Sequence, residues 1–176
     1  MLTLVGLSGT GKSTVARLLA ERWNWACADV DERVESEAGR TIAEIFASDG
    51  ESTFRALEAA QLTQALGGHH TIIAAGGGAP CQDQAMDAIL AAGPCIWLSA
   101  SLEVIASRVV ESEERPLLGG VDTTRIVAHL SEQLQSREEV YIRAPFSVST
   151  DEREPLAVVE AIEALLQAQG EGPWAP

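Results

Sequence analysis

The sequence contains little cysteine, few aromatic residues and a single lysine. Its three cysteines, Cys27, Cys81 and Cys95, are widely spaced over 176 residues and form no Cys-x-x-Cys pair. This spacing argues against a disulfide framework or a zinc site, so we expect ordinary buried thiols in a reducing compartment. No apolar run is long enough to cross a bilayer and nothing resembles a signal peptide, so the sequence predicts a cytoplasmic protein.

Basic residues are also scarce. The chain carries 12 basic and 26 acidic residues, a formal charge of −14, which argues against binding to nucleic acid or to an anionic membrane. With 46% hydrophobic and 22% charged residues, the composition is that of a globular protein. The length predicts one domain over 1–169, which we expect to be a monomer, followed by a loose Gly- and Pro-rich tail over 170–176.

The only lysine, Lys12, lies in a glycine-rich segment that fits the phosphate-loop pattern G-x-x-x-x-G-K-[ST] from Gly6 to Ser13. An apolar run, Leu2–Val5, precedes this segment and helical spacing follows it, which is the expected strand–loop–helix context. Glycines allow backbone N–H groups to curl around a phosphate, and the new helix adds its positive N-terminal end. A chance match is the alternative, and the position of the single lysine argues against it.

The motif assigns chemistry to its residues. Lys12 is expected to contact the β- and γ-phosphates of a nucleotide, and the Ser13 hydroxyl to bind Mg²⁺. The predicted nucleotide-binding residues of this segment are Gly9, Thr10, Gly11, Lys12, Ser13 and Thr14.

Apolar strand-like runs alternate with helical patterns along the chain, which is typical of βα units that form a parallel sheet. The predicted strands are Leu2–Gly6, Trp25–Val30, Thr71–Ala75, Pro94–Leu98 and Phe146–Ser149. The predicted helices cover 12–23, 32–38, 51–67, 82–92, 101–112, 123–141 and 155–168, with a short helical piece around Ile42–Phe46. We therefore expect an α/β protein of the P-loop type, with a five-stranded parallel sheet flanked by helices and ligands at the carboxyl ends of the strands.

Two of these strand ends carry candidate site residues. Asp29 and Asp31 follow the second strand, where one carboxylate could serve a Mg²⁺ site and the other could accept a hydrogen bond from a substrate hydroxyl. The alternative is an acidic helix start with Asp31 as the N-cap. Gly76-Gly77-Gly78 follows the third strand and permits close approach of a ligand, although a flexible turn before Pro80 is the alternative.

Two arginines interrupt apolar helix faces. Arg55 begins a face that continues through Ala59, Leu62 and Leu66, and Arg137 shares a face with Leu130, Leu134 and Tyr141. A cation on an inward face needs an anionic partner, which could be the carboxylate of a small substrate held by bidentate hydrogen bonds. An internal ion pair is the alternative, because Glu58 lies three residues after Arg55 and two glutamates follow Arg137.

The segment Glu111–Gly120 joins two predicted helices and contains Arg115. A lid over about 111–122 could close over the transferring phosphoryl group, exclude water and bring this arginine to the developing charge. A solvated loop with an isolated charge is the alternative.

Taken together in order and spacing, these motifs resemble those of shikimate kinase over nearly the whole chain. The segments that carry the resemblance are the phosphate loop at 6–14, Asp29-x-Asp31, Gly39–Phe46, Gly50–Arg55 with Glu58, Gly76–Gly78, Arg115–Leu118, and Arg137 with Tyr141. The resemblance implies a P-loop kinase fold with an acceptor-binding region over about 29–60, and transfer of the γ-phosphate of Mg·ATP to the 3-hydroxyl of shikimate in aromatic amino-acid biosynthesis.

The resemblance also implies roles for individual residues. Asp31 would hold the substrate hydroxyls and assist deprotonation, and Asp29 would serve the Mg²⁺ site together with Ser13. Arg55 and Arg137 would hold the carboxylate, with Gly77 and Gly78 lining the ring. Lys12, Asp31 and Arg115 form the implied catalytic set, Arg115 would also contact ATP, and Arg108 and Arg153 would lie near the adenine.

The chain departs from the family pattern at Glu139, Arg143 and Pro145, none of which has an assigned role in the implied site. Two other functions stay open at this point. A gluconate or nucleoside monophosphate kinase could use the same scaffold, although paired arginines and an Asp-x-Asp suit a small hydroxy acid better, and only 5% of the residues are aromatic. A nucleotide-binding module without turnover would have no need of the two aspartates, the two inward arginines and the lid arginine.

Overall fold

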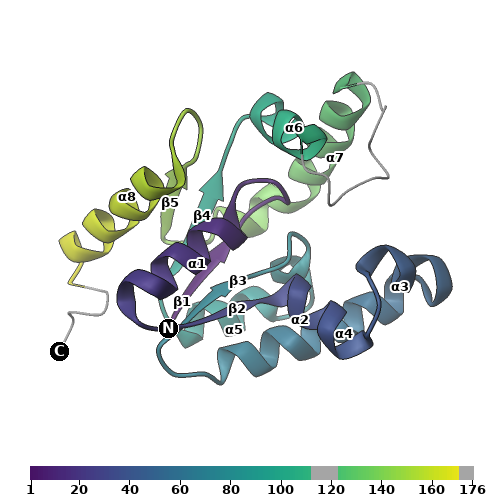
Figure 1. Ribbon diagram of the computed structural model, residues 1–176, viewed down its shortest axis with the longest axis horizontal. Coiled ribbons are helices and arrows are strands. Elements are labelled where there is room, and N and C mark those ends of the chain that lie inside the picture. Colours follow the sequence, from purple (N-terminus) through teal and green to yellow (C-terminus); the bar gives the residue numbers. More distant parts are fainter. Residues whose placement is uncertain (112–122, 171–176) are drawn as a thin grey trace.

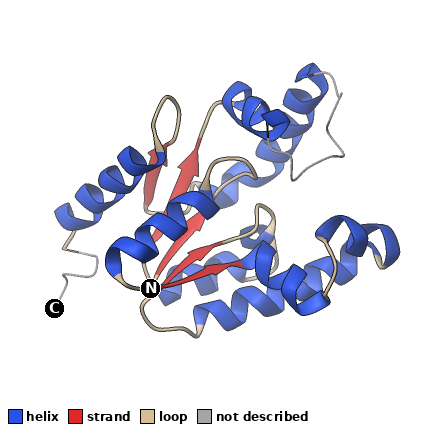
Figure 2. Cartoon of the chain, in the orientation of Figure 1, coloured by secondary structure: helices blue, strands red, loops and turns tan. Residues whose placement is uncertain are grey.

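The computed structural model describes residues 1–111 and 123–170. Five parallel strands form one sheet in the order β2-β3-β1-β4-β5 (Figures 1 and 2). The strands are β1 (Leu2–Val5), β2 (Ala26–Asp29), β3 (Thr71–Ala74), β4 (Cys95–Ser99) and β5 (Phe146–Ser149). This confirms the predicted five-stranded parallel sheet, and each strand lies within two residues of its predicted bounds.

Helices cover both faces of the sheet because side chains along each strand alternate between the two faces. Leu2 and Leu4 of β1 pack with α1 (Lys12–Trp23) and α8 (Pro155–Ala168) on one face. Val5 packs on the other face with α4 (Gly50–Leu66), α5 (Ala85–Ala92), α6 (Leu102–Glu111) and α7 (Thr123–Tyr141). No helix within the described residues is long and apolar enough to cross a membrane.

A small lobe extends from one edge of the sheet, at the right of Figure 1. It consists of α2 (Val30–Ala38), α3 (Ile42–Ser48) and the start of α4, around a separate apolar cluster of Val34, Ile45 and Phe54. Thr41 and Glu44 form a reciprocal capping box at the start of α3. The lobe corresponds to the region that the resemblance assigns to the acceptor.

Several local predictions were wrong. The predicted helix 82–92 begins three residues later than expected: α5 starts only at Ala85, and a short 3₁₀ helix, η1 (Ala79–Cys81), with Pro80 in its first turn, precedes it. On α4 the buried face holds Glu58 and Gln61, whereas Ala59 is exposed. Cys27 is also exposed, so the expectation of three buried thiols was wrong, and only Cys95 is fully buried.

The lid predicted over about 111–122, including Arg115, lies outside the described residues except for the backbone of Glu111. The tail predicted over 170–176 also lies outside them, apart from Gly170.

Candidate active site

The phosphate loop connects β1 to α1. Three of its glycines, Gly6, Gly9 and Gly11, have positive φ angles of 137°, 88° and 91°, which side chains with a Cβ rarely adopt. Lys12 is only 8% exposed, and its ammonium donates to the carbonyl oxygens of Gly6 and Leu7, each at 2.9 Å. The loop thus wraps around the Lys12 side chain, and its carbonyl oxygens hold the ammonium group at the cavity.

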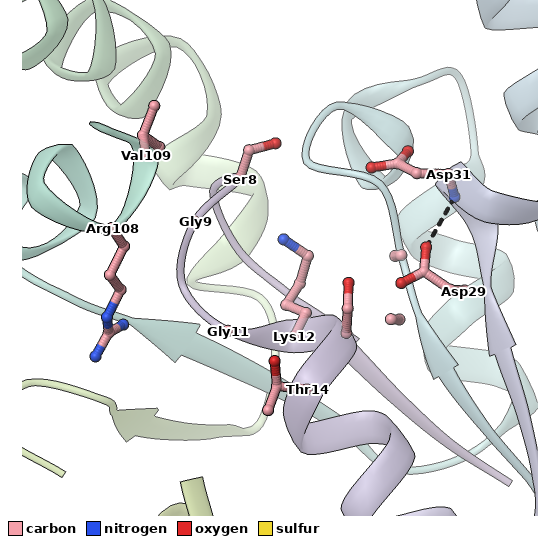
Figure 3. Close-up of a pocket in the computed structure, with 12 residues that line it drawn as sticks. Ser8, Gly9, Gly11, Lys12, Thr14, Asp29, Asp31, Arg108 and Val109 are labelled. Atoms are coloured by element: carbon pink, nitrogen blue, oxygen red, sulfur yellow. Dashed lines mark hydrogen bonds between the residues drawn. The ribbon is translucent and has the colours of Figure 1, made fainter. Parts of the chain in front are cut away.

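A cavity of about 300 Å³ opens above this loop (Figure 3). Lys12 lies near its centre, with Asp29 and Asp31 on one side and Arg108 and Val109 on the other. Five further residues of the phosphate loop and the start of α1 line it: Ser8, Gly9, Gly11, Ser13 and Thr14. Thr10 is absent from this lining and its hydroxyl donates to the Leu7 carbonyl at 2.8 Å, so it braces the loop.

The two aspartates differ in their surroundings. Asp29, not Asp31, caps α2: its Oδ1 accepts from the Asp31 backbone N–H at 3.1 Å, and the helix begins at Val30, two residues before its predicted start. The alternative that Asp31 is the N-cap was therefore wrong. The Asp31 carboxylate projects from the first turn of α2 toward the cavity (Figure 3).

The glycine triad after β3 is buried and lies against charged side chains. A Cβ on Gly76 would lie 2.5 Å from Glu58 Oε1 and 2.6 Å from Asp31 Oδ1, and a Cβ on Gly78 would lie 2.5 Å from an Arg55 nitrogen. Cβ atoms do not approach other atoms this closely, so the charged groups can contact the strand end only because these residues are glycines.

Glu58 and Arg55 form an ion pair on α4, as the alternative reading of the sequence predicted. Arg55 Nη1 donates to Glu58 Oε2 at 2.7 Å, and Arg55 Nη2 donates to Glu51 at 3.1 Å. Glu58 is 1% exposed, and burial raises the pKa of its carboxyl, an effect that the Arg55 hydrogen bond opposes. The buried carboxylate fixes the guanidinium beside Gly78, and 21% of the Arg55 side chain stays exposed.

Arg137 and Tyr141 reach the same place from α7. An Arg137 nitrogen lies 3.4 Å from where a Cβ on Gly77 would stand. Arg137 and Arg55 therefore lie beside neighbouring residues of the glycine triad, Gly77 and Gly78. The structure therefore brings together Asp31, Arg55, Gly77, Gly78 and Arg137, the five predicted acceptor residues.

Arg108 lines the cavity on the side opposite Asp29 and Asp31 (Figure 3). The Arg108 guanidinium donates to the Thr150 hydroxyl at 3.0 Å and to the Thr150 carbonyl at 2.9 Å, and so ties α6 to the loop between β5 and α8. Arg153 lies exposed in that loop and does not line the described cavity. Its contact with ATP stays a prediction.

Sequence reasoning missed some functional neighbours. Ser8, Val109 and Cys81 were not singled out, although Ser8 lies within the phosphate-loop motif. Cys81 ends η1, which packs against both α4 and α7, and the sequence offers no signal for that position because it depends on how these helices converge.

The chemistry of the cavity suits a magnesium ion that arrives with a nucleotide. Within the described residues there is no group of three or more His, Cys, Asp and Glu side chains that could hold a metal ion. Mg²⁺ usually keeps several waters and is bound by one or two protein oxygens together with substrate phosphates. Ser13 and Asp29 offer such oxygens in the lining of the cavity that also contains Lys12.

Comparisons with known proteins agree with this geometry. The shikimate kinase family profile matches residues 8–167. Shikimate kinase of Symbiobacterium thermophilum is 39% identical over 173 residues, covering 97% of this chain and 98% of that protein. Shikimate kinase of Thermobifida fusca is 38% identical over 171 residues and covers 97% of each chain.

Solved structures of shikimate kinases also have the fold of this chain. The shikimate kinase of Bacteroides thetaiotaomicron superimposes with a TM-score of 0.87 at 26% identity, over 94% of this chain and 97% of that one. The shikimate kinase of Acinetobacter baumannii in complex with shikimate gives 0.86 at 28% identity, over 96% and 93%. A gluconokinase of Sinorhizobium meliloti gives only 0.54 at 16% identity, a likeness of fold alone.

Proposed function

The chain belongs to the shikimate kinase family of ATP-dependent kinases, and on that premise we propose how its residues transfer the γ-phosphate of ATP to the 3-hydroxyl of shikimate. The observation that carries the proposal is the convergence of two sets of side chains on Gly76–Gly78. The phosphate loop lies against this triad, since a Cβ on Gly77 would lie 3.1 Å from Ser8 Oγ. Asp31, Arg137 and Arg55 lie against the same triad, beside Gly76, Gly77 and Gly78 respectively.

The phosphate loop and α1 bind the nucleotide. Backbone N–H groups from Gly9 to Thr14 surround the phosphates, and the Lys12 ammonium exchanges its carbonyl contacts for the β- and γ-phosphate oxygens. Ser13 and Asp29 would hold Mg²⁺, which neutralises phosphate charge when it is bound. Arg115 and Arg153 contact ATP from the lid and from the loop after β5.

The acceptor lies between the small lobe and α7. Arg55 and Arg137 hold the shikimate carboxylate by charge-assisted hydrogen bonds, while the Gly77 and Gly78 backbone leaves room for the ring. The Asp31 carboxylate accepts a hydrogen bond from the reacting hydroxyl and takes its proton as the new oxygen–phosphorus bond forms and the bond from the γ-phosphorus to the bridging oxygen breaks, which releases ADP. These residues act mainly by positioning and by stabilising charge, which is what phosphoryl transfer requires.

The first test is a coupled assay of ADP release with Mg·ATP, comparing shikimate, quinate, gluconate and nucleoside monophosphates. We expect turnover with shikimate, and we expect Arg137→Ala to raise the KM for shikimate far more than the KM for ATP. ADP release with another acceptor would keep the phosphate chemistry and overturn the acceptor assignments. Absence of turnover with every acceptor would favour a nucleotide-binding module. A cytoplasmic location and a monomeric state stay predictions from the sequence.

A further inference from the structure

Tyr141 is the last residue of α7 and the only tyrosine in the chain. Its side chain is fully buried, and its hydroxyl donates to the carbonyl oxygen of Gly77. The residues lie 64 positions apart in sequence, so this hydrogen bond fixes the end of α7 against the loop after β3. No step of the reaction proposed above uses it.

Tyr141 also lies close to Arg137. It follows Arg137 by one helical turn, and an Arg137 nitrogen lies 3.4 Å from where a Cβ on Gly77, the acceptor of the Tyr141 hydrogen bond, would stand. Burial raises the pKa of Tyr141 to about 12, and the nearby charge of Arg137 opposes this only in part. The phenol therefore stays protonated and remains a donor to Gly77 throughout the neutral range.

The ring of Tyr141 extends the contact toward the nucleotide side. Its centroid lies 6.1 Å from that of Trp97 on β4, and a Cβ on Gly6 would lie 3.3 Å from Trp97 Cδ1. Gly77 itself packs against the Ser8 backbone, because a Cβ there would lie 3.2 Å from Ser8 N. Tyr141 is thus bonded to Gly77, beside which Arg137 lies, and is connected through Gly77 and Trp97 to both ends of the segment Gly6–Ser8.

We propose that Tyr141 is a positioning residue for the acceptor: its hydroxyl fixes Arg137 and the Gly77 peptide in one geometry, at a set distance from the phosphate loop. This inference rests on the proposed function. The residue need not touch either substrate. Removing the hydroxyl leaves Arg137 free to leave the carboxylate-binding geometry and leaves the Gly77 carbonyl without its donor, whereas the phosphate loop keeps its own internal hydrogen bonds.

The test is Tyr141→Phe, which removes one oxygen atom and keeps the ring. We expect the KM for shikimate to rise about threefold to tenfold, the range for loss of one buried hydrogen bond, while the KM for ATP changes less than about twofold. A matched control is Ile162→Val on α8, which is buried on the opposite face of the sheet and should lower stability by a similar amount without changing either KM.

A double-mutant cycle separates positioning from general packing. If Tyr141 acts through Arg137, adding Tyr141→Phe to Arg137→Ala should change the KM for shikimate by less than about half of its effect alone. Fully additive effects, or equal changes in both KM values in Tyr141→Phe, would overturn the inference while leaving the proposed function intact. A wild-type protein that does not phosphorylate shikimate would overturn both.

Discussion

Asp29 combines two roles that can be separated by substitution. Its carboxylate caps α2, and we propose that it also holds Mg²⁺. Asparagine caps a helix about as well as aspartate but offers no charge to a metal ion. We therefore expect Asp29→Asn to keep the thermal midpoint within about 2 °C and to raise the Mg²⁺ concentration for half-maximal activity about tenfold or more.

The control is Asp29→Ala, which should also lower the free energy of unfolding by about 1 kcal/mol through loss of the cap. Thermal unfolding and magnesium titration of activity measure the two effects separately. An unchanged magnesium requirement in Asp29→Asn would mean that Asp29 serves only as a helix cap.

Glu58 should make stability depend on pH. Its folded-state pKa is raised above the ordinary glutamate value, mainly by burial, so the folded protein binds this proton more tightly than the unfolded chain does. The free energy of unfolding should therefore fall as pH rises from the ordinary glutamate pKa through the raised value. Urea unfolding from pH 4 to 7 should show that Glu58→Gln lacks this decrease.

Glu51→Gln is the matched control, because Glu51 contacts the same arginine but its side chain is 66% exposed. Its unfolding free energy should follow the wild-type pH dependence. If the unfolding free energy of Glu58→Gln had the same pH dependence as that of the wild-type protein, the proton would be bound by a group other than Glu58.

At the scale of elements, the loop after β3 depends on the absence of side chains. Ala at position 78 would push Arg55 out of place, since its Cβ would stand 2.5 Å from the guanidinium. We expect Gly78→Ala to raise the KM for shikimate at least about tenfold, with the KM for ATP changed less than about twofold. Steady-state kinetics with each substrate varied would measure both.

Gly67→Ala provides a matched control. Gly67 ends α4 with φ −78°, and a Cβ there would meet nothing closer than 3.5 Å. Its kinetics should resemble those of the wild-type protein. An equal effect of both substitutions would mean that Gly78 tolerates a side chain and that the triad serves only as a turn.

The elements themselves could largely be predicted from the sequence, because strand runs, the phosphate loop and helix starts are local patterns. The residues on the inward face of α4 could not be predicted in this way. Its buried positions include Glu58 and Gln61, polar residues whose partners Arg55 and Arg33 give them a place in the interior. Hydrophobic spacing therefore pointed to the exposed Ala59. The α2 start was misplaced because Val30, a good strand former, is in fact the first helical residue.

The arrangement of the site residues depends less on local sequence patterns than the helices and strands do. Asp31, Gly77 and Gly78 could be expected to lie close together, because the carboxyl ends of parallel strands meet at one edge of the sheet. Arg55 and Arg137 reach them from α4 and α7, which depends on how those helices pack. Their orienting contacts, such as Tyr141 to Gly77, join segments far apart in sequence and need the packed fold. Arg143, which departs from the family pattern, is a second example. It forms an ion pair with Asp87 on α5, and no local sequence pattern indicates that contact.

For the whole molecule, charge is the dominant imbalance. The excess of 14 acidic residues (26 minus 12) makes the compact state repel itself. The described ion pairs oppose this only weakly, since most of them are exposed, such as Arg143–Asp87 with side chains 44% and 66% accessible. Screening should therefore relieve more repulsion than it removes attraction.

We expect the thermal midpoint to rise by about 2–4 °C between 20 and 200 mM NaCl, which corresponds to about 1 kcal/mol for a chain of this size. The rise should level off above about 0.15 M, where the screening length falls to about 8 Å. Calorimetry at neutral pH in nucleotide-free buffer measures this, and an uncharged osmolyte at equal osmolality controls for excluded-solute effects. A midpoint that falls with salt would instead show that attraction within the site and at the surface ion pairs outweighs the repulsion of the net charge.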